Sequence, residues 1–165
     1  MGTGQMMITI AAMMLLSTIL LRINATFLST STALYETKYD VLAVSLGTSI
    51  IENATSKAFD EATVVNPVSS VTDLSLILRA ETGEVYPNFD DIDDFNNYTM
   101  TTANDTTFLS AVFDVGCQVN YVNQNNPQQI SSSRTWHKRI DVRVTSPSMQ
   151  DTIRLSSVVS YWYFR

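Results

Sequence analysis

The chain has 165 residues and a formal net charge of −6 at neutral pH. This length suits one compact domain with an appendage, and the sequence has no basic stripe interleaved with aromatic residues, so we expect no nucleic-acid binding. Cys117 is the only cysteine, which excludes an intrachain disulfide and leaves a packed core to stabilise the fold.

Residues 6–21 form the most apolar segment: thirteen of the sixteen are apolar, and no charge precedes Arg22. A helix that is apolar on every side must be buried in lipid or in protein. Sixteen residues span about 24 Å, slightly less than a bilayer core. A cleaved secretory signal is the alternative. It would carry basic residues before the apolar run and a small-residue cleavage site after it, so we expect the segment to be retained.

The helical pattern continues through residues 22–59, but its apolar residues lie on one face. They recur at steps of three, four or seven, as Leu28, Tyr35, Tyr39, Leu42, Leu46, Ile50 and Ala54. This spacing predicts an amphipathic helix, and no proline occurs before Pro67. We therefore expect one helix from about residue 5 to about residue 58, whose later part lays its apolar stripe on the rest of the chain.

Residues 60–114 are loop-rich and acidic, with eleven acids and a single base, Arg79. Alternating apolar residues over 74–80 indicate a short strand or an extended segment. A turn at 81–84 follows it. Residues 88–98 then predict an acidic loop anchored by aromatic side chains.

From residue 107 onward the apolar period becomes two, which is typical of strands with one buried face. The predicted faces span 109–121, 136–144 and 153–163, and they indicate a three-stranded antiparallel meander. Cys117 falls on the first apolar face, where we expect a buried, inert thiol. Lys138 lies among the apolar residues of the second face. His137 lies on its polar face, where we expect a solvated side chain.

These elements predict an α+β fold, in which a long N-terminal α-helix packs on a small antiparallel β-sheet. We assign residues 1–59 to the helix, with 6–21 as its apolar segment and 22–59 as its amphipathic part. Residues 60–165 form an acidic, β-rich globular part, called the head below.

Four aspartates in the acidic loop form the best candidate metal site, because calcium prefers several carboxylate and carbonyl oxygens on a turning loop. They are Asp90, Asp91, Asp93 and Asp94. Their spacing lacks the glycine of an EF-hand loop, and a solvated acidic loop is the alternative. The sequence contains no nucleophile–base pair, zinc-ligand spacing or phosphate-binding glycine loop, so we expect no other cofactor and no enzymatic activity.

Four N-x-Thr sequons occur, and the positions of their asparagines decide which are plausible glycosylation sites. Asn24 and Asn53 lie on the predicted helix and would be poor acceptors if it is packed. Asn97 and Asn104 lie in the exposed loop, and they are the candidate acceptors.

A long N-terminal helix with an apolar first third, followed by a variable loop and an antiparallel sheet, resembles the type IV pilin-like superfamily of pilins, minor pilins and type II secretion pseudopilins. Two stretches are similar to bacterial minor-pilin-like proteins: the acidic segment 89–95, and the terminal hairpin of 138–144 and 153–159. Family members carry a glutamate at the fifth residue of the hydrophobic segment, where this chain, counted from Met1, has Gln5.

The resemblance implies a structural subunit of an extracellular filament on the cell surface, held in the inner membrane before pilus or secretion machinery assembles it. The chain would be its own partner. The residues expected to make the assembly contacts are Gln5, Met6, Met7, Ile8, Ile10, Met13, Met14, Leu15, Leu16, Ile19, Leu20 and Leu21.

Two alternatives remain open: a minor pilin or pseudopilin of a secretion system, and a single-pass membrane-anchored protein with an outer β domain. Six of the nine residues at 24–32 are mediocre helix formers, and the resemblance implies that the helix unwinds locally there in the filament.

Overall fold

The computed structural model describes residues 2–105 and 110–162. It comprises two compact units, Met1–Lys38 and Tyr39–Arg165. The long helix predicted from the sequence is present as α1 (Thr3–Thr55), a single 53-residue α-helix whose residues belong to both units. The fold class is α+β, as predicted.

In the first unit, α1 exposes its side chains on every side over residues 2–30. Its threonine hydroxyls turn back to the helix instead of facing outward. Thr9 and Thr18 donate to carbonyls three residues earlier, at 2.9 and 2.8 Å, and Thr26 donates to one four residues earlier at 2.9 Å. These bonds satisfy polar groups within an otherwise apolar surface.

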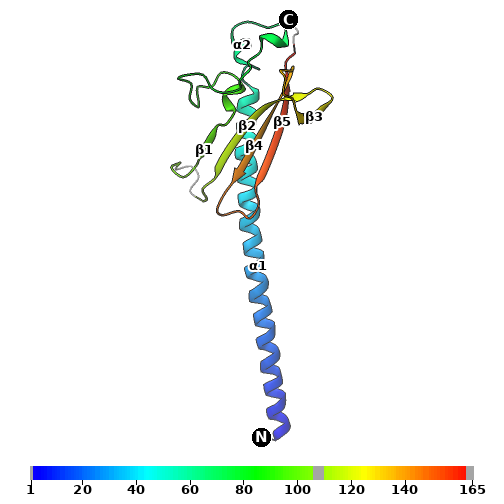
Figure 1. Cartoon of the computed structure of the whole chain (residues 1–165). Coiled ribbons are helices and arrows are strands. Elements are labelled where there is room, and N and C mark those ends of the chain that lie inside the picture. Colours follow the sequence, from blue (N-terminus) through cyan, green and yellow to red (C-terminus); the bar gives the residue numbers. More distant parts are fainter. Residues whose placement is uncertain (1, 106–109, 163–165) are drawn as a thin grey trace. The chain divides into compact units, whose positions relative to one another are not determined.

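The second unit contains an antiparallel sheet in which the strand order is β1-β2-β4-β5 (Figure 1), with β3 paired to β2. The strands are β1 (Thr99–Thr101), β2 (Asp114–Asn123), β3 (Asn126–Ile130), β4 (His137–Thr145) and β5 (Ile153–Ser160). Cys117 lies opposite Val142, which lies opposite Leu155. The predicted three-stranded meander is therefore confirmed as β2, β4 and β5.

The sequence analysis did not identify two short strands, and the segment that it predicted as a short strand or an extended segment is neither. β3 lies inside the predicted polar loop, and β1 precedes β2. Residues 74–80 form bends and irregular backbone, and three of their carbonyls accept hydrogen bonds from side chains. Leu78 O accepts from Asn96 Nδ2, and Leu74 O accepts from Arg134 Nη1. The predicted face residues Leu109 and Tyr163 lie outside the described residues.

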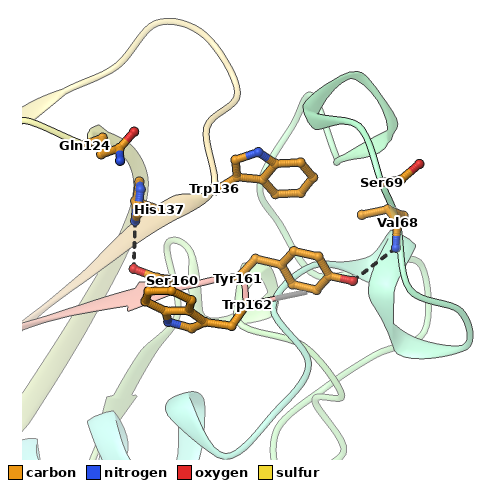
Figure 2. Close-up of a pocket in the computed structure, with 8 residues that line it drawn as sticks. All are labelled: Val68, Ser69, Gln124, Trp136, His137, Ser160, Tyr161 and Trp162. Atoms are coloured by element: carbon orange, nitrogen blue, oxygen red, sulfur yellow. Dashed lines mark hydrogen bonds between the residues drawn. The ribbon is translucent and has the colours of Figure 1, made fainter. Parts of the chain in front are cut away.

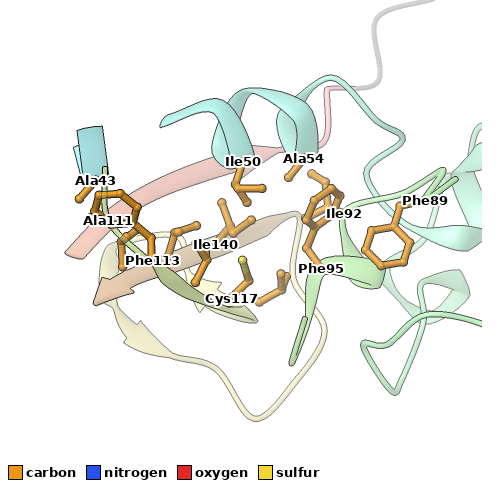
Figure 3. Close-up of a cluster of buried hydrophobic side chains, with 14 residues drawn as sticks. Ala43, Ile50, Ala54, Phe89, Ile92, Phe95, Ala111, Phe113, Cys117 and Ile140 are labelled. Atoms are coloured by element: carbon orange, nitrogen blue, oxygen red, sulfur yellow. The ribbon is translucent and has the colours of Figure 1, made fainter. Parts of the chain in front are cut away.

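The main core lies between α1 and the sheet within the second unit (Figure 3). From the helix come Ala43, Ile50 and Ala54, and from the strands come side chains such as Val142 and Ile140. Each fully buried aliphatic side chain contributes roughly 1.5–3 kcal/mol. This packing explains why the helix periodicity of 3.6 and the strand periodicity of two occur in one chain.

Coverage of the predicted apolar stripe begins at Tyr39, and the prediction that it begins at Leu28 is wrong. Tyr39, Leu42 and Leu46 pack against the core, whereas Leu28 and Tyr35 are exposed. The physical reason is length. Strands of eight to ten residues are about 26–34 Å long, and helix residues 39–55, about 25 Å long, already match them.

Three short helical elements follow α1 along the chain and precede β1. They are α2 (Glu61–Val64) and the 3₁₀ turns η1 (Val71–Asp73) and η2 (Asp93–Phe95). Asp60 caps α2, and its carboxylate accepts the Ala62 N–H. The chain leaving α1 is tied to the acidic loop by a bridge at Ala58, whose N–H and C=O bond to Asp90 and Ile92 at 3.0 Å each. This bridge places Asp60 next to the aspartates of residues 90–94.

Candidate functional site

The apolar segment 6–21 of α1 is a candidate assembly or membrane-insertion surface. Its large apolar side chains are about half or more exposed, from 45% at Ile19 to 72% at Met7 and Met13. Gln5 is exposed as well. The helix has the length and composition to cross a membrane, and none of its most apolar part is buried. Exposure of so many apolar side chains to water is unfavourable, so lipid or other helices are needed to cover them.

A buried ionic network lies at the centre of the head, and Lys138 organises it. The Lys138 ammonium is fully buried. It donates to the carboxylates of Asp60 at 2.7 Å and Asp93 at 2.5 Å, and to the carbonyl of Phe59 at 2.8 Å. Three acceptors around one ammonium satisfy all of its donors. A buried charge is tolerated only when it is paired and hydrogen-bonded in this way.

Further contacts hold the network in place. Asp60 accepts bonds from the N–H and hydroxyl of Ser75 and from the hydroxyl of Tyr121, at 2.9–3.1 Å. The Lys138 ammonium also lies 4.5 Å from the centre of the Phe59 ring, within range of a cation–π interaction. Burial alone would raise the pKa of the Asp60 carboxyl, but Lys138 and Ser75 outweigh it and lower the pKa. Asp60 is therefore ionised at neutral pH.

The sequence placed Lys138 on the apolar face of its strand, and the structure confirms this, but the sequence did not find its partners. Those partners lie 78 and 45 residues away in the chain. A lysine among apolar residues that alternate along a strand is the signal that could have indicated an ionic partner. A buried lysine needs an acidic side chain nearby, which must then come from elsewhere in the chain.

The acidic loop is not the solvated loop that was the alternative to a metal site. Asp91, Asp93 and Asp94 are buried, and only Asp90 is exposed. The aromatic residues anchor the loop as predicted: the rings of Phe89, Phe95, Tyr98 and Tyr86 lie 5.0–6.1 Å from their neighbours. Their packing draws the aspartates between them into the interior.

Burial changes the acidity of these aspartates. It raises the pKa of Asp91 to about 8, with a further contribution from the charges of Asp93 and Asp94. It raises the pKa of Asp93 to about 7 even though Lys138 opposes the shift. The carboxylates thus lie in a region where negative charge is poorly compensated within the described residues.

The structure divides the predicted calcium ligands and adds others. Asp93 belongs to the Lys138 network, whereas Asp90 and Asp91 lie with Glu61, and Asp94 lies with Glu81 and Glu84. Within each group of three, one carboxylate oxygen per residue lies within 4.8 Å of the others. Sequence analysis missed the three glutamates because they lie in α2 and in the turn at 81–84, away from the aspartates in sequence.

A cavity of about 400 Å³ lies beside the start of β4 and the end of β5 (Figure 2). Trp136 stacks on Tyr161 with ring centres 5.3 Å apart, and the hydroxyl of Tyr161 accepts the Val68 N–H at 3.1 Å. His137 was expected to be solvated, but it is half-buried here. Its Nδ1 lies 2.7 Å from the Ser160 hydroxyl. The two residues are direct cross-strand partners, and strand pairing accounts for this contact.

The remaining candidates are single residues. Cys117 is buried, as predicted, and burial raises the pKa of its thiol to about 12.

Asn97 and Asn104 are both exposed, as a glycan acceptor must be. Asn97 has a positive φ of 63°, which asparagine tolerates better than most residues. Thr106, the third residue of the Asn104 sequon, lies outside the described residues.

No family model matches the sequence, and neither a curated protein nor a solved structure matches it. The likeness to pilins is therefore one of shape. It consists of a long apolar N-terminal helix and an antiparallel sheet that packs on the C-terminal part of that helix.

Proposed function

We propose that this chain is a pilin-like structural subunit of an extracellular filament, and that it polymerises through residues 6–21 of α1. The observation that supports this most strongly is the exposure of the whole apolar segment. The head closes its own core with helix residues from Tyr39 onward, so the apolar segment is not needed to fold it. A segment that the fold does not use is available for other copies of the same helix.

The energetics favour such an assembly. Burying one aliphatic side chain yields roughly 1.5–3 kcal/mol, and each subunit offers thirteen apolar residues between Met6 and Leu21. The four methionines in this segment, Met6, Met7, Met13 and Met14, suit a helix that must adapt to several neighbours, because their side chains are flexible. Gln5 would contribute hydrogen bonds in place of a charge.

The same segment supports a membrane location before assembly, since α1 has the length and composition to cross a bilayer. In this proposal, assembly machinery moves the subunit from the inner membrane into a surface filament. The second candidate is a permanent single-pass membrane anchor for the head, which the hydropathy of α1 favours equally. A minor pilin or pseudopilin, present in few copies, would use the same contacts. We propose no catalytic activity and no nucleic-acid partner for any of the three.

Microscopy of material sheared from the surface of the native cells tests the proposal. Abundant uniform filaments that contain this chain would support the major-subunit assignment. Filaments with only traces of the chain would support the minor-subunit alternative. Retention of the chain in the membrane, with no filaments that depend on its gene, would overturn the proposal in favour of the anchor.

A charge placed in the apolar segment tests the contact surface itself. Leu16→Asp should abolish filaments while the head still folds, because it places an unpaired carboxylate in a dry interface. Ser45→Asp is the matched control, since it adds the same charge to an exposed position of α1 outside both the apolar segment and residues 24–32. Filaments that survive Leu16→Asp unchanged would contradict a role for this segment in assembly.

A further inference from the structure

Two groups of carboxylates converge on one part of the head. Glu81, Glu84 and Asp94 form one group, and Glu61, Asp90 and Asp91 form the other. The groups adjoin, because Asp94 Oδ2 accepts the backbone N–H groups of Asp90 and Asp91 at 3.0 and 3.3 Å. Like charges at this distance repel unless a proton or a cation compensates them; burial and a hydrogen bond with Glu84 raise the pKa of Glu81 to about 7.

A second observation is independent of this clustering. Three buried carboxylates have an oxygen without a hydrogen-bond partner: Oδ2 of Asp91, Oδ2 of Asp93 and Oδ1 of Asp94. Asp91 and Asp94 are the buried members of the two groups, whereas the other oxygen of Asp93 is held by Lys138. Asp91 and Asp94 are 0% and 2% exposed. A buried carboxylate oxygen without a partner is costly, and native proteins rarely leave one so unless water or an ion meets it.

Among the described residues, none of the ion pairs seen involves these six carboxylates; Lys138 lowers the pKa of Asp91 through its charge, but its hydrogen bonds go to other groups. These ion pairs are Lys138 with Asp60 and Asp93, and Arg139 with Asp141. The ammonium of Lys138 is fully used by its three acceptors. The six carboxylates of the two groups are therefore not neutralised by any of these bases.

We propose that these two groups bind calcium, with Asp94 and Asp91 as the buried ligands and the more exposed glutamates and Asp90 completing the coordination. Calcium suits a set of carboxylate oxygens from separate segments because it accepts six to eight oxygen ligands in flexible geometry. Magnesium demands stricter octahedral geometry, and zinc prefers nitrogen and sulfur ligands. Asp93 is not a ligand in this assignment, since it is held by Lys138.

Bound calcium would connect the acidic loop to the start of α2 through one group and to the turn at 81–84 through the other. These parts contain no strands of the sheet. Binding to the folded state alone raises stability by mass action. The consequence is a head that is more stable outside the cell, where calcium is available.

The test uses the full chain in detergent micelles, with thermal unfolding followed by circular dichroism at constant ionic strength. Calcium at a few millimolar should raise the Tm by roughly 5 °C or more relative to chelator, and magnesium should raise it much less. Titration calorimetry with calcium should give one or two ions per chain. No calcium-dependent rise, or an equal rise with magnesium, would overturn the proposal.

Variants separate a bound ion from general screening of negative charge. The triple change Glu61→Gln, Glu81→Gln and Glu84→Gln removes ligands outside the buried core, so the head should still fold and the calcium-dependent rise should disappear. The matched control is Glu52→Gln, Asp114→Asn and Asp151→Asn, which removes three exposed charges elsewhere. Calcium must still stabilise this control. Equal loss in both variants, or full retention in the first, would contradict the assignment.

Discussion

Gly47 of α1 lies so close to Leu155 of β5 that a Cβ on the glycine would be 2.7 Å from the Leu155 Cδ1. Such a Cβ would also lie 3.3 Å from the Val144 Cγ2. The helix approaches the sheet here because this position carries no side chain. Glycine costs about 1 kcal/mol of helix propensity relative to alanine, so the close packing must offset that cost.

We therefore predict that Gly47→Val destabilises the protein by about 1–3 kcal/mol, because it overpacks the interface between helix and sheet. Urea unfolding of the full chain in detergent measures the change. Ser45→Val is the control, since Ser45 is an exposed position of the same helix, and it should change stability by under about 0.5 kcal/mol. Equal effects of the two changes would contradict the role given to Gly47.

The Lys138 network yields a second prediction. Lys138→Met should destabilise the head by about 3–5 kcal/mol, because it leaves the carboxylates of Asp60 and Asp93 buried without their cation. Adding Asp60→Asn and Asp93→Asn to this variant should recover part of the loss, since the remaining groups are then neutral. Chemical denaturation of the single, double and triple variants gives the coupling energies. Arg154→Met, which removes an exposed base, is the control.

Strictly additive effects in that series would contradict the network. They would mean that Lys138 stabilises the head through its apolar stem alone, as long basic side chains can do. The expected result is instead a triple variant more stable than the Lys138→Met single variant, because the changes share one set of contacts.

The parts of this fold that could be predicted from sequence are those in which apolar residues recur at a regular spacing. Residues of α1 from Tyr39 to Ala54 and strands β2, β4 and β5 repeat apolar side chains at steps that only one secondary structure satisfies. Strand β3 could not be found in this way, because all five of its residues are exposed. It pairs with the C-terminal end of β2, at Val122 and Asn123, and the register shifts between these two residues.

The candidate sites depend on contacts between distant residues, which a local period does not record. The four aspartates of residues 90–94 suggested metal binding. The pairing of Asp93 with Lys138, and the approach of Glu81 and Glu84 to Asp94, could not be predicted from the sequence. Nor could it be predicted that Phe89 and Phe95 would bury the aspartates between them. By contrast, the exposed apolar segment 6–21 could be located from sequence, because it is a continuous apolar run.

Cys117 gives a third prediction, which concerns reactivity. Burial raises the pKa of its thiol to about 12, so at pH 8 only roughly one thiol in ten thousand is ionised, and the thiolate is the reactive form. We expect the folded chain to react with a disulfide reagent far more slowly than the chain in denaturant. A Cys117→Ser/Ser132→Cys variant, whose only thiol is at an exposed position, should react quickly when folded. Fast reaction of native Cys117 would contradict its burial.

The last prediction concerns residues 24–32 of α1 in the assembled filament. In the single chain this stretch is helical, yet six of its nine residues have modest helix propensity: Asn24, Thr26, Ser29, Thr30, Ser31 and Thr32. The hydroxyls of Thr26 and Thr32 bond to carbonyls four residues earlier, at 2.9 and 3.1 Å. Such bonds slightly destabilise and often bend helices. The stretch follows directly after the segment proposed to pack in the filament.

We expect the stretch to unwind locally on assembly. Extended chain rises about 3.3 Å per residue against 1.5 Å in a helix, so nine unwound residues would lengthen each subunit by about 16 Å. Replacing Ser29, Thr30 and Ser31 with alanine should raise helix propensity and shorten or abolish the unwound part. Cryo-electron microscopy of wild-type and variant filaments measures both effects. An unbroken helix from Met6 to Thr55 in the wild-type filament would contradict the prediction, because the modest propensities of this stretch would then have no structural consequence.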